Sequence, residues 1–285
     1  MKILVTGKNG QLGCEINKLS KKNNFNWLFL DIDTFDLFNL NNIINFLENS
    51  SPDIIINCAA YTSVEGAEDD FETAITINHR AVKLIAKWTY INNCRLIHIS
   101  TDYVYDGMSL IPYVETDKEN PLNNYGKSKL LGDIECQKNN PTSIIIRTSS
   151  LYSSFGNNFV KNIIDLLENN DEIKVISDQV SSPTYAADLA NTILFLIKNK
   201  LWHSGIYNYT NSGEISWYDF ANEIKDIYGF KSDIKPILTK EFNQKAIRPK
   251  YSVLDNSKIK NTFGISQNDY KDSLRNCIKI LKDGS

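Results

Sequence analysis

The chain has 285 residues, of which 42% are hydrophobic and 23% charged. These proportions are ordinary for a globular protein, and the length fits one large α/β domain or a domain with a smaller lobe. The formal net charge of −3 provides no basic surplus for binding nucleic acid. No stretch approaches the roughly 18 apolar residues that a membrane-spanning helix requires, so we expect no membrane segment.

The N-terminus and the cysteines predict the cellular compartment. Met1 to Val5 lead directly into a predicted strand and lack the pattern of a signal peptide. The five cysteines have no paired spacing, which is typical of reduced thiols. The three histidines have no metal-ligand spacing, and His98 lies in an apolar run where a structural role is the simpler interpretation. We therefore expect a cytoplasmic protein.

A glycine-rich turn follows the first predicted strand, 2–6, and leads into a predicted helix, 14–19. Gly7 permits a tight turn, Gly10 lets the backbone approach a pyrophosphate, and Gly13 lets helix and strand pack closely. The N-terminus of the helix offers free N–H groups and the positive end of the helix dipole to phosphates. This arrangement predicts a dinucleotide-binding site.

Asp31 follows the second predicted strand, 26–30, about 20 residues after the turn, where a carboxylate typically holds the adenosine ribose. A carboxylate there repels a 2′-phosphate and so favours NAD over NADP. Lys8 in the turn would soften this preference. A solvated carboxylate at the strand end is the alternative interpretation.

Strands and helices continue to alternate up to residue 148. Asn39 is a candidate cap for a helix over 40–47, and Thr101 follows a buried strand. The alternation predicts a doubly wound, Rossmann-type parallel sheet of the α/β class, which binds ligands at the carboxyl ends of its strands. The other predicted strands are 52–60, 95–100 and 143–147, and the other helices are 74–92 and 125–138.

The pattern changes after residue 148. We predict an NAD(P)-binding domain over 1–148, completed by parts of 174–207, and a smaller C-terminal α/β substrate lobe over 149–173 and 208–285. Short polar turns are expected after Ser252. The predicted helices here are 159–168, 186–198, 217–228 and 269–281, and the predicted strands are 174–177 and 205–209.

Tyr125 and Lys129 lie four residues apart in a predicted helix, so their side chains project from nearly the same face. A phenol ionises near pH 10, and a neighbouring ammonium lowers that pKa. The pair therefore predicts a general acid/base, and Thr101 could share the hydrogen bond to a substrate carbonyl. An exposed helix that happens to carry both residues is the alternative.

These motifs together resemble those of extended short-chain dehydrogenases/reductases. A closer resemblance, to the family of dTDP-4-dehydrorhamnose reductases, covers nearly the whole chain. It rests on the glycine-rich turn and on several further blocks: Asn57-Cys-Ala-Ala-Tyr-Thr62, Ser100-Thr-Asp-Tyr-Val-Tyr-Asp-Gly107, Pro121-Leu-Asn-x-Tyr-Gly-x-x-Lys129, Arg147-Thr-Ser149 and Ser182-Pro-Thr184.

The resemblance implies reduction of the C4 keto group of a dTDP-4-dehydro-6-deoxyhexose, with NADPH or NADH as cofactor and a monomer or homodimer as the assembly. Tyr125 would protonate the C4 oxygen, Thr101 would share its hydrogen bond, and Lys129 would hold the nicotinamide ribose and lower the Tyr125 pKa. Besides the three glycines, Tyr125 and Lys129, the implied cofactor contacts are Gln11, Leu12, Asp31, Asp36, Leu37, Ala59, Ala60, Tyr61 and Thr62. The implied substrate contacts are Thr101, Asp102, Ser150, Asn158, Arg248 and Ser252.

Two positions depart from the family pattern. Ser150 stands where the family usually has tryptophan, which leaves the hexose open. Glu15 matches an acid that holds a metal in some members, but Ala187 stands where a second acid is expected, so we predict no metal site. The alternatives are a 4-ketoreductase for another nucleotide-linked deoxysugar and a non-catalytic nucleotide-binding regulatory subunit; intact Thr101, Tyr125 and Lys129 argue against the latter.

Overall fold

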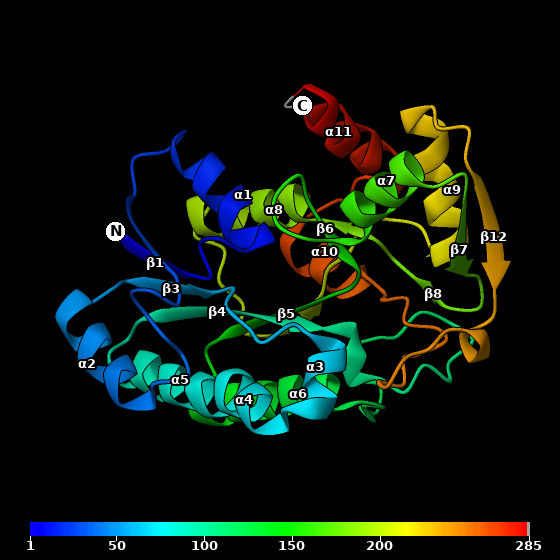
Figure 1. Ribbon diagram of the computed structural model, residues 1–285. Helices are drawn as coiled ribbons and strands as arrows, with labels where there is room; N and C mark the ends of the chain where they lie inside the picture. Colours follow the sequence, from blue (N-terminus) through cyan, green and yellow to red (C-terminus); the bar gives the residue numbers. More distant parts are fainter. Residues whose placement is uncertain (284–285) are drawn as a thin grey trace.

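The computed structural model describes residues 1–283 and has a six-stranded sheet at its centre (Figure 1). Its order is β2-β1-β3-β4-β5-β10, and each neighbouring pair is parallel. The predicted α/β class with a Rossmann-type parallel sheet is confirmed. The strands are β1 (Lys2–Thr6), β2 (Asn26–Leu30), β3 (Ile54–Asn57), β4 (Arg95–Thr101), β5 (Ile144–Thr148) and β10 (Gly205–Asn208).

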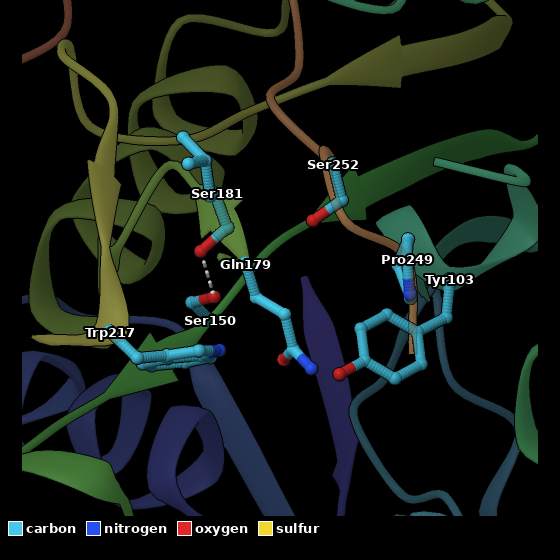
Figure 2. Close-up of a pocket in the computed structure, with 8 residues that line it drawn as sticks. Tyr103, Ser150, Gln179, Ser181, Trp217, Pro249 and Ser252 are labelled. Atoms are coloured by element: carbon cyan, nitrogen blue, oxygen red, sulfur yellow. Dashed lines mark hydrogen bonds between the residues drawn. The ribbon is translucent and has the colours of Figure 1, made fainter. Parts of the chain in front are cut away.

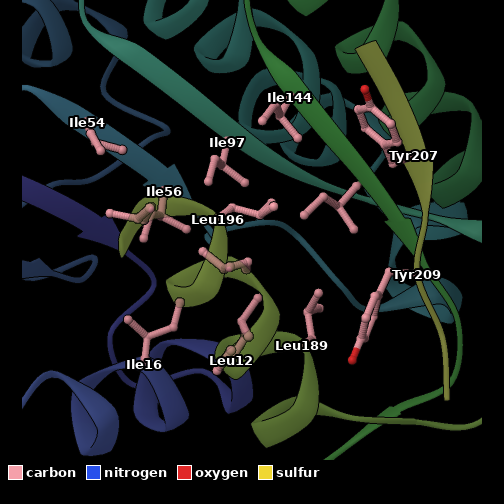
Figure 3. Packing of buried hydrophobic residues seen from close by; sticks show 14 of the residues in the cluster. Leu12, Ile16, Ile54, Ile56, Ile97, Ile144, Leu189, Leu196, Tyr207 and Tyr209 are labelled. Atoms are coloured by element: carbon pink, nitrogen blue, oxygen red, sulfur yellow. The ribbon is translucent and has the colours of Figure 1, made fainter. Parts of the chain in front are cut away.

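Helices cover both faces of this sheet, which explains its nearly continuous aliphatic strands. In β3, Ile54 and Ile56 point into one core with α1 and α8, and Ile55 points into the opposite core with α2 and α5. Figure 3 shows the first of these cores, where Leu12 and Ile16 of α1 meet the strands. The helices are α1 (Gln11–Ser20), α8 (Ala186–Lys198), α2 (Leu40–Ser50), α5 (Ala81–Ile91) and α6 (Asn124–Asn139).

A third core lies beside the sheet, around Phe220 and Leu274. Three helices and a parallel strand pair enclose it (Figure 1). Two short strand pairs connect it to the sheet: β6 (Leu151–Tyr152) with β9 (Thr184–Tyr185), and β8 (Val180–Ser181) with β11 (Ile215–Ser216). The other elements are α7 (Phe159–Asn169), α9 (Trp217–Tyr228), α11 (Tyr270–Asp283), β7 (Glu172–Ile176) and β12 (Asp233–Ile237).

Three sequence-based expectations differ from the structure. The helix expected over 74–92 is interrupted by the π-helical segment η1 (Thr76–Arg80), and α10 (Ser257–Phe263) occupies a stretch expected to be polar turns. Asn39 stands at the N-cap of α2, but its side chain makes no capping hydrogen bond. The remaining short elements are α3 (Val64–Asp69), α4 (Phe71–Ile75), η2 (Asp102–Val104) and η3 (Thr239–Glu241).

The division into two lobes remains a proposal. Both β10 and α8 lie with the central sheet, although they follow the first segments of the third core. Ile259 and Phe263 of α10 also belong to the core between the sheet, α1 and α8, although α10 lies in the predicted substrate lobe. Among residues 1–283, no helix has both the length and the apolarity to cross a membrane.

Candidate active site

Helix α6 brings Tyr125 and Lys129 to the carboxyl end of β4. Asn123 caps the helix, its side chain accepting the N–H of Gly126 at 2.8 Å. A Cβ at Gly126 would lie 2.2 Å from the Tyr103 carbonyl oxygen, so glycine there allows the helix to approach η2 closely. Lys129 is buried, and its Nζ donates to the Ile99 carbonyl of β4 at 2.6 Å.

Thr101, the last residue of β4, completes this group. Its hydroxyl is hydrogen-bonded to the Tyr125 phenol and donates to Asp102 Oδ1 at 3.1 Å. The Tyr103 ring meets the Tyr125 ring edge to face, with centroids 5.9 Å apart. The structure therefore brings the three predicted catalytic side chains together at the edge where parallel sheets bind ligands.

One predicted effect is wrong in this structure: Lys129 does not lower the pKa of Tyr125. Burial raises the Tyr125 pKa to about 12, and the hydrogen bond from Thr101 opposes this rise while Asp102 and Asp133 add to it. The Lys129 ammonium is directed to the Ile99 carbonyl instead, and burial lowers its own pKa to about 8. Tyr125 is therefore a neutral phenol, a proton donor, at physiological pH.

Asp102 supplies a buried carboxyl group beside Thr101. The Ser149 hydroxyl donates to its Oδ2 at 2.8 Å, and Ser252 also hydrogen-bonds to it. Burial raises the Asp102 pKa to about 6, although these hydroxyl groups lower it. A carboxyl group surrounded by hydroxyl groups next to the predicted catalytic residues is suited to hold a sugar hydroxyl.

The glycine-rich turn has the shape that a pyrophosphate requires. Gly7 has a φ of 69°, and a Cβ on Gly13 would lie 2.1 Å from the Gly7 carbonyl oxygen. The first N–H groups of α1, including that of Gln11, have no partner within the helix. The side chain of Leu12 is buried in the core, so only its backbone can contact a phosphate.

Asp31 links this turn to the end of β2. Its Oδ2 accepts the N–H of Asn9 at 2.7 Å, and its Oδ1 accepts the N–H of Ile32 at 2.8 Å. Each carboxylate oxygen keeps a further lone pair for a ribose hydroxyl. Lys8 Nζ lies 3.5 Å from Asp33, near the same site.

The two predicted adenine contacts, Asp36 and Leu37, lie in different environments. Asp36 lines a surface cavity of about 340 Å³ together with Thr34 and Phe46. Leu37 is buried and packs with α2 and α5 under the sheet. Of these two predicted adenine contacts, only Asp36 therefore has a side chain on the surface of this cavity.

The loop 59–62 lies beyond the end of β3 and is held by Asn78, a residue that the sequence did not single out. Asn78 Oδ1 accepts the N–H of Tyr61 at 2.9 Å, while its Nδ2 donates to the Tyr61 carbonyl and to Ser128. Asn78 lies in the π-helical segment η1. Single π-helical turns inside α-helices frequently occur at functional sites. In the sequence, Asn78 stands out only as a polar residue within a predicted buried helix.

The predicted substrate contacts are not equally placed. Ser150 and Ser252 line one pocket (Figure 2). Arg248 pairs with Glu65, its Nη2 lying 3.0 Å from Oε1, while its buried Nε has no partner among residues 1–283. The Asn158 side chain caps α7 and donates to the carbonyls of Ser153 and Phe155.

A buried ionic network lies under the predicted catalytic residues, and the sequence did not indicate it. Arg147 is fully buried and donates to Asp133, Tyr105 and Glu119 at 2.9–3.1 Å. Asp133 follows Lys129 by one helical turn, and its negative charge favours the charged form of Lys129. The network therefore places a negative charge next to Lys129.

The same network continues across the sheet through neutral groups. His98 Nε2 lies 3.9 Å from Asp133 Oδ1, and Nδ1 of His98 is 3.0 Å from Asn57 Nδ2. Asn57 Oδ1 accepts the hydroxyl of Thr6, which in turn accepts the N–H of Ala59. Burial lowers the His98 pKa well below its usual value, so the predicted structural role of His98 is confirmed.

Glu15, the candidate metal ligand, is buried on α1 and accepts a hydrogen bond from the Ser153 hydroxyl at 2.7 Å. Burial raises its pKa. Residues 1–283 contain no group of three or more potential ligands that could hold a metal ion. In this chain Glu15 thus connects α1 to the loop that follows β6.

Comparisons with known proteins agree with this geometry. The family model described as the RmlD substrate binding domain matches residues 1–282. A dTDP-4-dehydrorhamnose reductase from Aggregatibacter actinomycetemcomitans is 37% identical, covering 96% of this chain and 97% of the relative. The crystal structure of a dTDP-4-dehydrorhamnose reductase from Clostridium acetobutylicum has 41% identity and a TM-score of 0.95, with coverage of 99% and 100%. A Bacillus anthracis dTDP-4-dehydrorhamnose reductase, solved in complex with NADP, has 34% identity and a TM-score of 0.93, with coverage of 98% and 99%.

Proposed function

The chain belongs to the RmlD substrate binding domain family, that of the dTDP-4-dehydrorhamnose reductases, and we propose that it reduces the C4 keto group of dTDP-4-dehydrorhamnose to give dTDP-L-rhamnose. The observation that supports this most directly is the cluster of Thr101, Tyr125 and Lys129 beside the buried Asp102. A regulatory subunit without catalysis would not need an acid, a second hydroxyl and a buried ammonium in one place.

Proton transfer is the step that the chain's own residues perform. NADPH or NADH, when bound, supplies the hydride that C4 receives. Tyr125 donates its proton to the C4 oxygen. The Thr101 hydroxyl, which donates to Asp102 in the structure, turns to donate a second hydrogen bond to that oxygen. The carbonyl gains one hydride and one proton and becomes an alcohol. The hydrogen bond with Thr101 favours the phenolate that Tyr125 leaves behind, and the Lys129 ammonium is proposed to hold the nicotinamide ribose.

The cofactor contacts follow from the elements around this cluster. The pyrophosphate is proposed to lie on the turn of Gly7, Gly10 and Gly13 and on the first N–H groups of α1. The adenosine ribose lies at Asp31, and residues 59–62 follow the cofactor toward Lys129. Lys8 beside Asp33 supplies positive charge that makes a 2′-phosphate acceptable.

On the substrate side, Asp102 is proposed to bind a sugar hydroxyl. Ser150 and Ser252 line the neighbouring pocket, and Arg248 lies close enough to Tyr103 to affect its pKa. The guanidinium is suited to the diphosphate because it is a strong partner for phosphate oxygens. We propose a cytoplasmic enzyme that acts as a monomer or homodimer.

The test is NADPH and NADH oxidation by the purified protein with enzymatically prepared dTDP-4-dehydrorhamnose, compared with other dTDP-4-keto-6-deoxysugars. We expect turnover with dTDP-4-dehydrorhamnose and identify the product as dTDP-L-rhamnose by NMR. Faster turnover of another keto sugar would favour the alternative 4-ketoreductase. Tight cofactor binding without turnover of any of them would favour the regulatory alternative.

A further inference from the structure

The pocket in Figure 2 has an aromatic side chain that the sequence did not assign to the site. Its lining includes Ser150, Gln179, Ser181 and Trp217, together with Tyr103 and Ser252. The enclosed part of this pocket measures about 10 Å³, the room of about one water molecule. A sugar ring would therefore lie across the mouth of the pocket, against the side chains that line it.

Trp217 differs from the other tryptophans in its hydrogen bonding. The indole N–H groups of Trp27, Trp88 and Trp202 each donate to an acceptor in the protein. The Trp217 indole has no such acceptor among residues 1–283, and Figure 2 shows its nitrogen at the end that faces Gln179. A half-buried indole usually has a partner for its N–H, so this one is available to a ligand.

The position of Trp217 is fixed by the fold. It is the first residue of α9, directly after the strand pair of β8 and β11, and its backbone N–H donates to the Gln179 carbonyl at 3.3 Å. The Phe159 ring lies 4.4 Å from the indole, centroid to centroid. These contacts set the position of the indole ring at the edge of the pocket.

The pocket is also connected to the catalytic residues. Tyr103 lines it and contacts the ring of Tyr125, while Ser252 lines it and hydrogen-bonds to Asp102. The Ser150 and Ser181 hydroxyls lie 2.7 Å apart on its wall (Figure 2). Aromatic carbon on one side and hydroxyl and amide groups on the other match a pyranose ring, which has C–H groups on its face and hydroxyls at its edge.

Building on the proposed function, we propose that Trp217 is a substrate-binding residue that holds the deoxyhexose ring. The indole packs against the C–H face of the sugar and its N–H donates to a sugar oxygen, while Gln179 and Ser181 hydrogen-bond to sugar hydroxyls. The thymidine half of the substrate extends out of this pocket.

Trp217→Ala and Trp217→Phe test this proposal, with Trp202→Phe as the matched control because Trp202 lies away from the pocket, bonded to Thr142. In Trp217→Ala we expect KM for dTDP-4-dehydrorhamnose to rise about tenfold, as expected for loss of one packed aromatic ring. In Trp217→Phe, which keeps an aromatic face, the rise is about threefold. The kcat, the KM for NADPH and the Kd for dTDP alone stay within about twofold, and Trp202→Phe matches the wild type.

A binding measurement keeps the test independent of turnover. dTDP-L-rhamnose should quench the tryptophan fluorescence of the wild type and of Trp202→Phe, but not of Trp217→Phe. An unchanged KM in Trp217→Ala, or quenching that survives in Trp217→Phe, overturns the proposal. An equal loss of affinity for dTDP alone also overturns it, because the indole would then hold the thymine. A wild type that does not reduce dTDP-4-dehydrorhamnose overturns the proposed function as well.

Discussion

Asp102→Asn should make the protein more stable at neutral pH while reducing its activity. The carboxyl group is 2% exposed, and burial raises its pKa from 3.8 to about 6. A raised pKa means that the folded state binds the proton more tightly than the unfolded state. Protonation of Asp102 therefore makes its full contribution to the free energy of unfolding below about pH 4. This contribution is lost as the pH rises through about 6.

The size of this effect follows from the pKa difference. A shift of about 2 units corresponds to roughly 3 kcal/mol, at about 1.4 kcal/mol per unit. The neutral asparagine avoids this cost, so its free energy of unfolding should exceed that of the wild type by up to about 3 kcal/mol at about pH 7.5, and should match it at about pH 4. Loss of the carboxylate in the sugar pocket should lower kcat/KM at the same time.

Urea unfolding of the wild type and of Asp102→Asn across this pH range measures the difference in their free energy of unfolding directly. The other carboxyl groups are the same in both proteins, so their contributions cancel in this difference. Asp226→Asn, at an exposed residue of α9, is the control. If Asp102→Asn were less stable than the wild type at about pH 7.5, the hydrogen bonds from Ser149, Thr101 and Ser252 would outweigh burial, and the reasoning would be refuted.

Two further predictions concern the charges under the site. Because burial lowers the Lys129 pKa to about 8, kcat should fall as the pH rises through about 8 and the ammonium loses its proton; a kcat that stays constant to about pH 9.5 would contradict the proposed role of the cation. Arg147→Met removes the hydrogen-bonded ion-pair partner of the buried Asp133, so the free energy of unfolding in urea should drop by about 3–5 kcal/mol. Arg95→Met, at an exposed residue, is its control, and an equal loss in both variants would argue against the buried network.

Much of the fold follows from local sequence patterns. The aliphatic runs of β1, β3 and β5 and the glycine-rich turn predict a parallel sheet because burial on both faces requires apolar side chains at every position. Other elements lack such a signal. The strand β12 contains Pro236, which weakens a strand prediction. In α10 only Ile259 and Phe263 are buried, so a short polar helix is hard to distinguish from a turn.

The candidate site was predictable where one short segment carries the chemistry. Tyr125 and Lys129 share one helix, and Thr101 ends the neighbouring strand, so spacing alone groups them. Trp217 comes from a distant segment, and only packing with β8 and β11 brings it near Ser150. The same limit applies to Asn78, whose role depends on the contact between η1 and the loop 59–62.

The pKa of Tyr125 shows a different limit. Sequence spacing places Lys129 on the same helix face but does not show where its ammonium points. The ammonium donates a hydrogen bond to the Ile99 carbonyl. The burial of the phenol then determines the direction of the Tyr125 pKa shift. Spacing predicts neighbours, whereas burial and hydrogen-bond partners depend on the whole fold.

The central claim is that Tyr125 donates the proton to the C4 oxygen, and Tyr125→Phe tests it most directly. The measurement is kcat for dTDP-4-dehydrorhamnose together with the Kd for NADPH, with the exposed Tyr90→Phe as control. The account predicts a loss of about 10²–10⁴ in kcat, typical of a removed general acid, with NADPH affinity within about threefold and a normal control. Retention of most of the wild-type kcat in Tyr125→Phe would contradict it.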